Sequence, residues 1–134
     1  MQVQQVPTEW APSVWGQVSH FFVPAIPHAR GDYTLEHMQA MVCTGQWMLV
    51  VATQGEQVVG AAVISLFNRP AARVAFIYAL GGKRVVTDNT LSQFKQLAAS
   101  LGATEVECAV RESVARLLRR VRIQEKYRIV GVQL

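Results

Sequence analysis

The fold of the chain is decided by the stretch Val74-Ala75-Phe76-Ile77-Tyr78-Ala79-Leu80-Gly81-Gly82-Lys83-Arg84-Val85-Val86-Thr87-Asp88. Its apolar first half predicts a buried strand that ends at Leu80. The two glycines and two cations that follow predict a turn, and Thr87 with Asp88 is typical of a helix start. Such a junction can hold an anion, because the first N–H groups of a helix are unpaired and carry partial positive charge.

Upstream of this junction, apolar spacing and turn residues predict two helices and two strands. Apolar residues at helical spacing follow Thr8 and Thr34, and prolines separate the two groups. Two further apolar runs flank the tight turn Gln54-Gly55-Glu56. The elements expected are an extended start at Val3–Val6, a helix that begins near Thr8, a loop over residues 23–33, a helix capped by Thr34 and ended by Gly45, and strands over Trp47–Thr53, Gln57–Phe67 and Arg73–Leu80.

Downstream of the junction, the pattern alternates between helix and strand. Strict alternation predicts a half-buried strand after Gly102, and two apolar stripes at helical spacing predict a helix on either side of it. The elements expected are a helix from about Thr87 to Ser100, whose cap is one of the residues 87–90, a strand over Glu105–Arg111, a basic helix capped by Ser113, and a final strand over Tyr127–Leu134.

The element order therefore predicts an α/β fold with a mixed sheet, β-α-α-β-β-β-α-β-α-β. The first three long strands form an antiparallel meander, and the strand–helix–strand step from Arg73 to Val110 is a right-handed parallel crossover. Helices are expected on both faces of the sheet. The length of 134 residues predicts one domain, 1–134.

Composition excludes several classes of protein. Half of the residues are hydrophobic, which indicates a folded globular chain, and the longest apolar run, Val58–Phe67, is too short for a membrane span. The N-terminus lacks the pattern of a secretory signal, so we expect a cytoplasmic protein whose two cysteines, Cys43 and Cys108, are buried thiols. The three histidines show no metal-ligand spacing, and we expect no metal; serine-nucleophile, P-loop and dinucleotide motifs are also missing.

Charge is distributed unevenly along the chain. Up to Phe67 there are one basic and four acidic residues, whereas twelve basic and five acidic residues follow. A basic half fits a polyanionic partner such as a phosphorylated cofactor or a nucleic acid, and it fits a solvated surface equally well. The arginines near residues 116–122 could contact nucleic acid phosphates, although no aromatic side chains interleave with them for base stacking, so a solvated or protein-facing surface is favoured.

The sequence resembles the GNAT superfamily, the acetyl-CoA-dependent N-acetyltransferases, over nearly its whole length. The resemblance lies in the element order and in four segments. These segments are Val58-Val59-Gly60-Ala61-Ala62, similar to the start of the family's third strand, Val74–Leu80, similar to its fourth, Leu80–Arg84, in the place of its pyrophosphate loop, and Glu105–Val110, similar to its fifth. In the family, the fourth strand pairs with the pantetheine arm of the cofactor, and the fifth strand splays away from it to form the cofactor cleft.

This resemblance implies an acetyl-CoA site along the fourth strand and its loop. The residues implied are Tyr78, Ala79, Leu80, Gly81, Gly82, Lys83 and Arg84. The sequence departs from the family in two places. Bulky residues follow the glycines where the family has small ones, and Leu118 stands at the position of the tyrosine that often serves the family as general acid.

Four candidate site residues have a purely structural interpretation beside the functional one. Lys83 and Arg84 either neutralise phosphates at the helix start or are loop charges in water. Tyr78 either lines a cleft and moves a proton or is a core tyrosine, and the core reading is favoured. Glu107 either acts as a general base or belongs, with Glu105 and Arg111, to a solvated or ion-paired strand face, which is favoured.

The Gly-Gly pair, the small size and the arginine after the fifth strand also resemble short GNAT-like proteins of bacteriophage morphogenesis clusters. This resemblance implies a degenerate acetyl-CoA site and a role in virion assembly or as an internal virion protein, in the host cytoplasm or the virion, through contacts with other protein subunits. The alternatives are an active N-acetyltransferase that acts on an amine, and a nucleic-acid-binding module.

Overall fold

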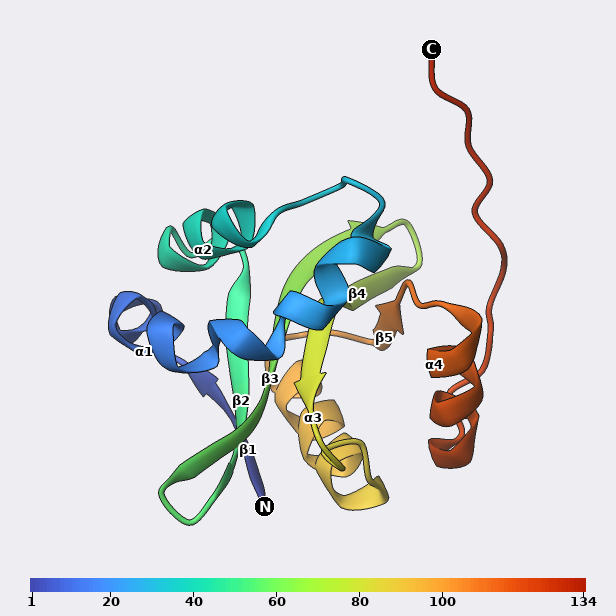
Figure 1. Ribbon diagram of the computed structural model, residues 1–134. Helices are drawn as coiled ribbons and strands as arrows, with labels where there is room; N and C mark the ends of the chain where they lie inside the picture. The colour runs from blue at the N-terminus through green and yellow to red at the C-terminus, as the bar shows by residue number, and fades with distance from the viewer.

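The computed structural model describes residues 1–134 and contains a five-stranded sheet of order β1-β2-β3-β4-β5 (Figure 1). The pairs β1–β2, β2–β3 and β3–β4 are antiparallel, and β5 runs parallel to β4. This arrangement confirms the predicted mixed sheet and meander. The strands are β1 (Gln2–Val6), β2 (Met48–Gln54), β3 (Gln57–Arg69), β4 (Ala72–Gly82) and β5 (Glu105–Cys108).

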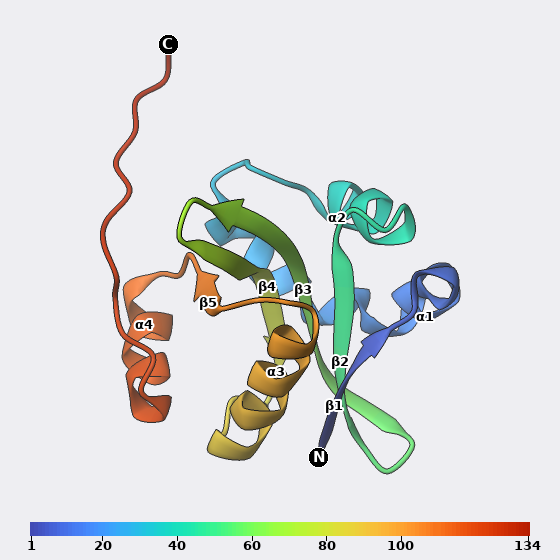
Figure 2. The same ribbon diagram turned by 180° about the vertical axis from the view of Figure 1, so that it is seen from behind.

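Helices cover both faces of the sheet, as expected. α1 (Ala11–Val18) and α2 (Leu35–Cys43) lie on one face, α3 (Asp88–Ser100) lies on the other, and α4 (Glu112–Leu118) follows β5 at the edge of the sheet (Figures 1 and 2). Short 3-10 helices extend α1 and α4. These are η1 (Thr8–Trp10), η2 (Ser19–Phe21), η3 (Val23–Ala29) and η4 (Arg119–Val121). The loop expected over residues 23–33 is therefore helical in its first part. No helix is both long and apolar enough to cross a membrane.

Alternating side chains of the central strands build a hydrophobic core on each face. On the α1–α2 face, β2 and β3 contribute buried Leu49 and Val63, which pack with Trp15 and Phe22. On the α3 face, buried Ile64 packs with Phe94 and its neighbours. Because successive residues of a strand point to opposite faces, apolar runs in the central strands supply both cores at once.

Two capping boxes fix the starts of α2 and α3. Thr34 and His37 exchange hydrogen bonds at the start of α2, and Thr87 and Thr90 do the same at the start of α3. Among the candidate caps, Thr87 is thus the one used. The prediction that Ser113 caps the last helix is wrong: α4 begins at Glu112, after Arg111, and no side chain caps it.

The predicted glycine turn is wrong in its position, because both glycines belong to β4. Gly81 pairs with Ala61 and Gly82 with Gly60, so the turn begins only at Lys83. A Cβ on Gly81 would lie 1.9 Å from the carbonyl oxygen of Phe21. Gly81 therefore lets η2 approach β4 closely, and this packing explains the glycine without any ligand.

The predicted final strand over Tyr127–Leu134 is also wrong. Residues 124–134 form no helix or strand, and their backbone makes no hydrogen bond to another backbone group. Lys126 and Tyr127 still contact the sheet through their side chains, and the segment after them projects away from the rest of the molecule (Figures 1 and 2). An apolar alternating pattern makes a strand only where a neighbouring strand supplies hydrogen bonds, and none lies beside this segment. The strand predicted over Glu105–Arg111 likewise ends at Cys108, where its pairing with β4 ends.

The contact between Gly81 and Phe21 leads to a first prediction. Gly81→Ala is expected to destabilise the protein by about 1–3 kcal/mol, because the added methyl group overlaps a backbone carbonyl that cannot move alone. Gly16→Ala is the matched control: no atom lies within 4 Å of a Cβ at this helical position, so a gain of about 0.5–1 kcal/mol is expected. Urea unfolding measures both. Equal stabilities of the two variants would contradict the packing role of Gly81.

Candidate functional site: the gap between β4 and β5

The candidate site is the place where β4 loses its partner on one side. β5 pairs only with Val74–Ile77, whereas β4 continues to Gly82 and stays paired with β3 on its other side. The edge of β4 that faces β5 is therefore free of strand partners from Tyr78 to Gly82. Backbone N–H and C=O groups at such an edge are available to an extended ligand.

A β-bulge marks the beginning of this free edge. Val63 lies opposite Ala79, and Ile64 lies opposite Ile77, so Tyr78 is an extra residue of β4. Bulges bend a strand and change the direction of the side chain at the bulge. The sequence did not predict this bulge, which depends on pairing between strands.

Four aromatic side chains surround the bulge, and we call them the aromatic cluster: Tyr33, Trp47, Phe76 and Tyr78. The rings of Trp47 and Tyr78 stack with centroids 4.0 Å apart, and Phe76 meets Tyr78 edge-on at 5.0 Å. The hydroxyl of Tyr33 donates a hydrogen bond of 2.6 Å to the carbonyl of Tyr78, and the Tyr78 hydroxyl lies 2.9 Å from Ser65 Oγ. Burial, assisted by the charge of Asp32, raises the pKa of Tyr33.

The aromatic cluster holds Tyr78 in a half-buried position where the gap begins. These contacts fit the favoured interpretation of Tyr78 as a packed tyrosine whose hydroxyl has a hydrogen-bond partner. Its position beside the free edge also fits the alternative, in which Tyr78 lines a cleft. Trp47 and Tyr33 were not expected at the site. Nothing in the sequence links them to Tyr78, since they lie before β2 and in the loop that precedes α2.

The turn after β4 places two cations at the start of α3. Lys83 and Arg84 are exposed, and Arg84 adopts a left-handed backbone conformation with φ of 57°. The hydroxyl of Thr90 donates a hydrogen bond to the carbonyl of Val85 and so ties the turn to the helix. The capping box uses the N–H of Thr90, and the acidic side chain of Asp88 lies in the first turn of the helix.

A hollow of about 290 Å³ lies between the first turns of α3 and the end of η4. Its charged side chains are one carboxylate and two cations, Lys95 and Arg122, neither of which was expected at the site. The hollow is lined by Asp88, Leu91, Ser92, Lys95, Val121 and Arg122. Lys83 and Arg84 lie in the turn before the helix and are not among the residues that line this hollow.

Glu107 lies in an ion-pair network on β5. Its carboxylate accepts two hydrogen bonds from the guanidinium of Arg69, one of them 2.8 Å long, and one of 2.6 Å from Lys126. The hydrogen bonds from Arg69 and then from Lys126 lower the pKa of Glu107 to about 2. A carboxylate that gives up its proton so readily is a weak base, so this arrangement favours the ion-paired reading over general-base catalysis.

Arg111, expected on the same strand face as Glu107, lies outside β5. Its guanidinium is 2.8 Å from Nε2 of His28 in η3. This contact joins the segment after β5 to the helices on the α1–α2 face. Leu118, at the position where the resemblance expects a tyrosine, is buried.

Both cysteines are only partly buried. Burial is the main cause that raises the pKa of Cys108, and the negative charge of Glu107 raises it further. The structure brings together no three histidine, cysteine or carboxylate side chains that could hold a metal ion.

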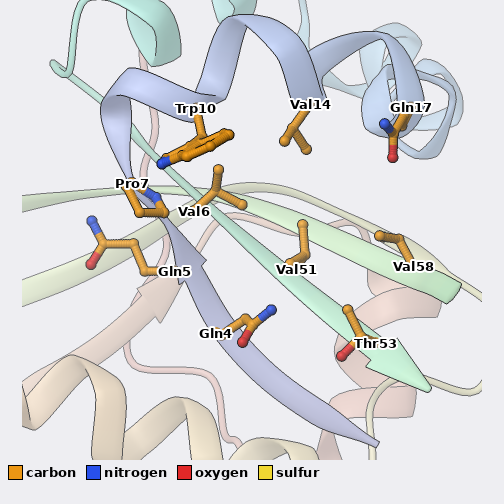
Figure 3. Close-up of a pocket in the computed structure, with 10 residues that line it drawn as sticks. All are labelled: Gln4, Gln5, Val6, Pro7, Trp10, Val14, Gln17, Val51, Thr53 and Val58. Atoms are coloured by element: carbon orange, nitrogen blue, oxygen red, sulfur yellow. The ribbon is translucent and has the colours of Figure 1, made fainter. Parts of the chain in front are cut away.

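A second hollow, of about 360 Å³, lies apart from the gap (Figure 3). It is enclosed by β1, the ends of β2 and β3, and α1, and the 60%-exposed side chain of Trp10 covers it. No charged residue lines it. Its position at the opposite edge of the sheet separates it from the candidate site.

Comparisons with known proteins give the fold a name. An aminoglycoside acetyltransferase, meta-AAC0020, from an uncultured soil metagenomic sample, in complex with sisomicin, aligns with a TM-score of 0.71 and 14% identity over 99% of this chain and 94% of that chain. The aminoglycoside 6'-N-acetyltransferase AAC(6')-IG of Acinetobacter haemolyticus aligns with a TM-score of 0.67 and 14% identity over 100% of this chain and 98% of that chain. A possible acetyltransferase of Clostridium difficile 630 aligns with a TM-score of 0.69 and 8% identity over 99% of this chain and 97% of that chain.

The chain has the GNAT acetyltransferase fold. No family model matches its sequence, and no curated protein matches it. At identities of 8–14%, the likeness to solved structures establishes the fold alone. The roles of Tyr78–Arg84 and the virion role stay predictions.

The network around Glu107 leads to a second prediction. Arg69→Met is expected to raise the pKa of Glu107 from about 2 toward 4.5, because the first cause of its lowering is removed. Arg73→Met is the control, since Arg73 bonds to Asn68 instead. Carbon-detected NMR titration of the carboxyl group measures this pKa, and an unchanged value would contradict the assignment.

The lowered pKa also gives the sign of the pH dependence. The ion pairs of Glu107 contribute fully above pH 4.5 and are lost as the pH falls toward 2, because the unfolded chain then binds the proton more tightly. The cations of these pairs are exposed to solvent, which screens the interaction, so we expect Arg69→Met to unfold only slightly more readily than the wild type at neutral pH and the difference to vanish as the pH falls toward 2.

Proposed function

We propose that this GNAT-fold chain binds an acyl-CoA, most simply acetyl-CoA, in the gap between β4 and β5 and transfers the acyl group to an amine. One observation carries the proposal: β4 runs five residues, Tyr78–Gly82, beyond its last pair with β5, with its edge toward β5 unpaired. An unpaired edge inside a sheet costs free energy unless water or a ligand satisfies it, and an amide-bearing extended arm is a suitable ligand.

The residues present fit the two chemically distinct parts of the cofactor. The free edge of Tyr78, Ala79 and Leu80 would hold the pantetheine arm, whose amides match its donors and acceptors. Lys83 and Arg84, with Lys95 and Arg122 around the start of α3, would hold the phosphates by charge. Side-chain cations would thus take the role of the glycine-rich backbone cradle, because Gly81 and Gly82 are committed to packing inside the sheet.

The acyl-CoA would supply an acyl group already activated as a thioester. An amine attacks the carbonyl carbon, the new C–N bond forms as the C–S bond breaks, and the amine proton passes to solvent or to the departing thiolate. The contribution of the chain is to orient the two reactants and to polarise the carbonyl through β4 backbone N–H groups. Leu118 cannot donate a proton, and Glu107 is held in ion pairs, so we expect a slow reaction without a strong acid or base from the protein.

The surroundings of the gap suit a singly charged or neutral amine better than a polycation. The two carboxylates of β5 are both neutralised, Glu105 by Lys126 and Glu107 by Arg69 and Lys126. The aromatic cluster forms an apolar wall where the gap begins. A polyamine antibiotic would lack free carboxylates to bind there.

A second candidate function is the assembly role that the sequence suggested, in which the acetyl-CoA site is degenerate and the chain acts through protein contacts, for example in a virion. Two observations favour it: the missing acid at Leu118 and the exposed apolar C-terminal segment. Nucleic-acid binding by α4 stays a prediction; Glu112 pairs with both Arg116 and Arg119 and reduces the free positive charge there.

Calorimetry with acetyl-CoA tests the first proposal. We expect binding to the wild type, weakened about tenfold to a hundredfold in the Lys83→Ala/Arg84→Ala double variant, because charge-assisted hydrogen bonds to phosphate are lost. Arg128→Ala is the control, since this arginine is almost fully exposed and lies outside the gap. A thiol-release assay with a series of amines then measures transfer.

The outcomes separate the two functions. No binding at millimolar acetyl-CoA would contradict the acyltransferase proposal and favour the assembly role. Binding that is equal in the wild type and the double variant would keep the ligand but remove Lys83 and Arg84 from its site. Binding without thiol release from any amine would leave a cofactor-binding protein that does not catalyse transfer.

A further inference from the structure

The C-terminal segment, residues 124–134, leaves its backbone groups without backbone partners and its large apolar side chains exposed. Its backbone makes no hydrogen bond to another backbone group. Its large apolar side chains are exposed to an extent found nowhere else in the chain, since Ile129, Val130 and Val132 are each more than 80% exposed. Exposed apolar groups of this size in a soluble protein indicate a surface that is covered by a partner.

The pattern of this segment is that of a strand with one buried face. Val130, Val132 and Leu134 alternate with Gly131 and Gln133, so a β conformation would place all three on the same side. The sequence predicted a strand here for this reason. What the structure lacks is a strand beside it.

The open edge of β5 is the complementary feature. β5 pairs with β4 on one side only and ends the sheet. Two apolar residues that are also exposed follow it, Val110 two residues after the strand and Leu117 on α4. An edge strand with free backbone groups is a template for pairing with another chain.

Charge favours β5 over β1, the other edge of the sheet. The C-terminal segment carries Lys126 and Arg128, and β5 carries Glu105 and Glu107, whereas β1 has no charged residue. Lys126 already binds both glutamates through its side chain, at 2.8 and 2.6 Å. Both ion pairs form within one molecule, so they hold the start of the segment beside β5 and leave the backbone of residues 128–134 unpaired.

We infer that the C-terminal segment of one molecule pairs as a strand with the edge of β5 of a second copy of the chain, and that the exchange is reciprocal. Each molecule has one open β5 edge and one unpaired C-terminal segment. In a two-fold dimer, each segment can therefore pair with the β5 edge of the other molecule. Within one molecule the segment leaves β5 after Tyr127, whose hydroxyl accepts a hydrogen bond from Arg69, and then projects away from the sheet (Figures 1 and 2). The inference does not depend on acyl-CoA binding.

Sedimentation equilibrium of the full chain, combined with hydrogen exchange, tests this inference. We expect a dimer at micromolar concentration whose amides in residues 128–134 are protected. Val132→Lys should weaken dimerisation by about a hundredfold or more, because a charge would enter the buried face of the strand. Val23→Lys is the matched control, since Val23 is an exposed valine of η3 outside the segment; the Kd of its dimer should equal that of the wild type.

Each other outcome would overturn the inference in a recognisable way. A monomer with protected amides would mean that the segment folds onto β5 of its own molecule. A monomer with unprotected amides would leave the segment for a different protein. A dimer with unprotected amides, or one that Val132→Lys does not weaken, would place the interface elsewhere.

Discussion

The parallel pairing of β4 with β5 extends over only four residues of each strand, and the rest of the site depends on where it stops. Beyond Ile77, β4 keeps β3 on one side and has no strand on the other. The bulge at Tyr78 falls at this point, and Arg111, three residues after β5, contacts His28 of η3. The sheet opens without losing its core, because most strand residues of the two hydrophobic clusters come from β2 and β3, which are paired on both sides.

The local parts of the fold could be predicted from the sequence because local chemistry determines them. Thr34 and Thr87 cap their helices, and the apolar runs that became β2 and β3 have the length and turn residues of a hairpin. The order of these elements was enough to recognise the GNAT fold, although identities to solved acetyltransferases are only 8–14%. Patterns of this kind persist when individual residues change, because many apolar residues satisfy the same core.

Features that depend on distant contacts could not be predicted. Gly81 and Gly82 suggested a phosphate-binding turn, but the carbonyl of Phe21 and the pairing with β3 explain them. The same holds for the cluster of Tyr33 and Trp47 around Tyr78, and for Arg69 as the partner of Glu107. The C-terminal segment has the alternating pattern of a strand, but the predicted strand does not form, because no neighbouring strand pairs with it in one molecule.

The central claim is that the free edge of β4 binds an acyl-CoA. It is tested most directly by backbone amide NMR of the protein titrated with acetyl-CoA. We expect chemical-shift changes and slower hydrogen exchange confined to Tyr78–Gly82, the turn at Lys83 and Arg84, and the first turn of α3. The absence of any change at saturating ligand, or changes centred on the hollow beneath Trp10, would contradict it.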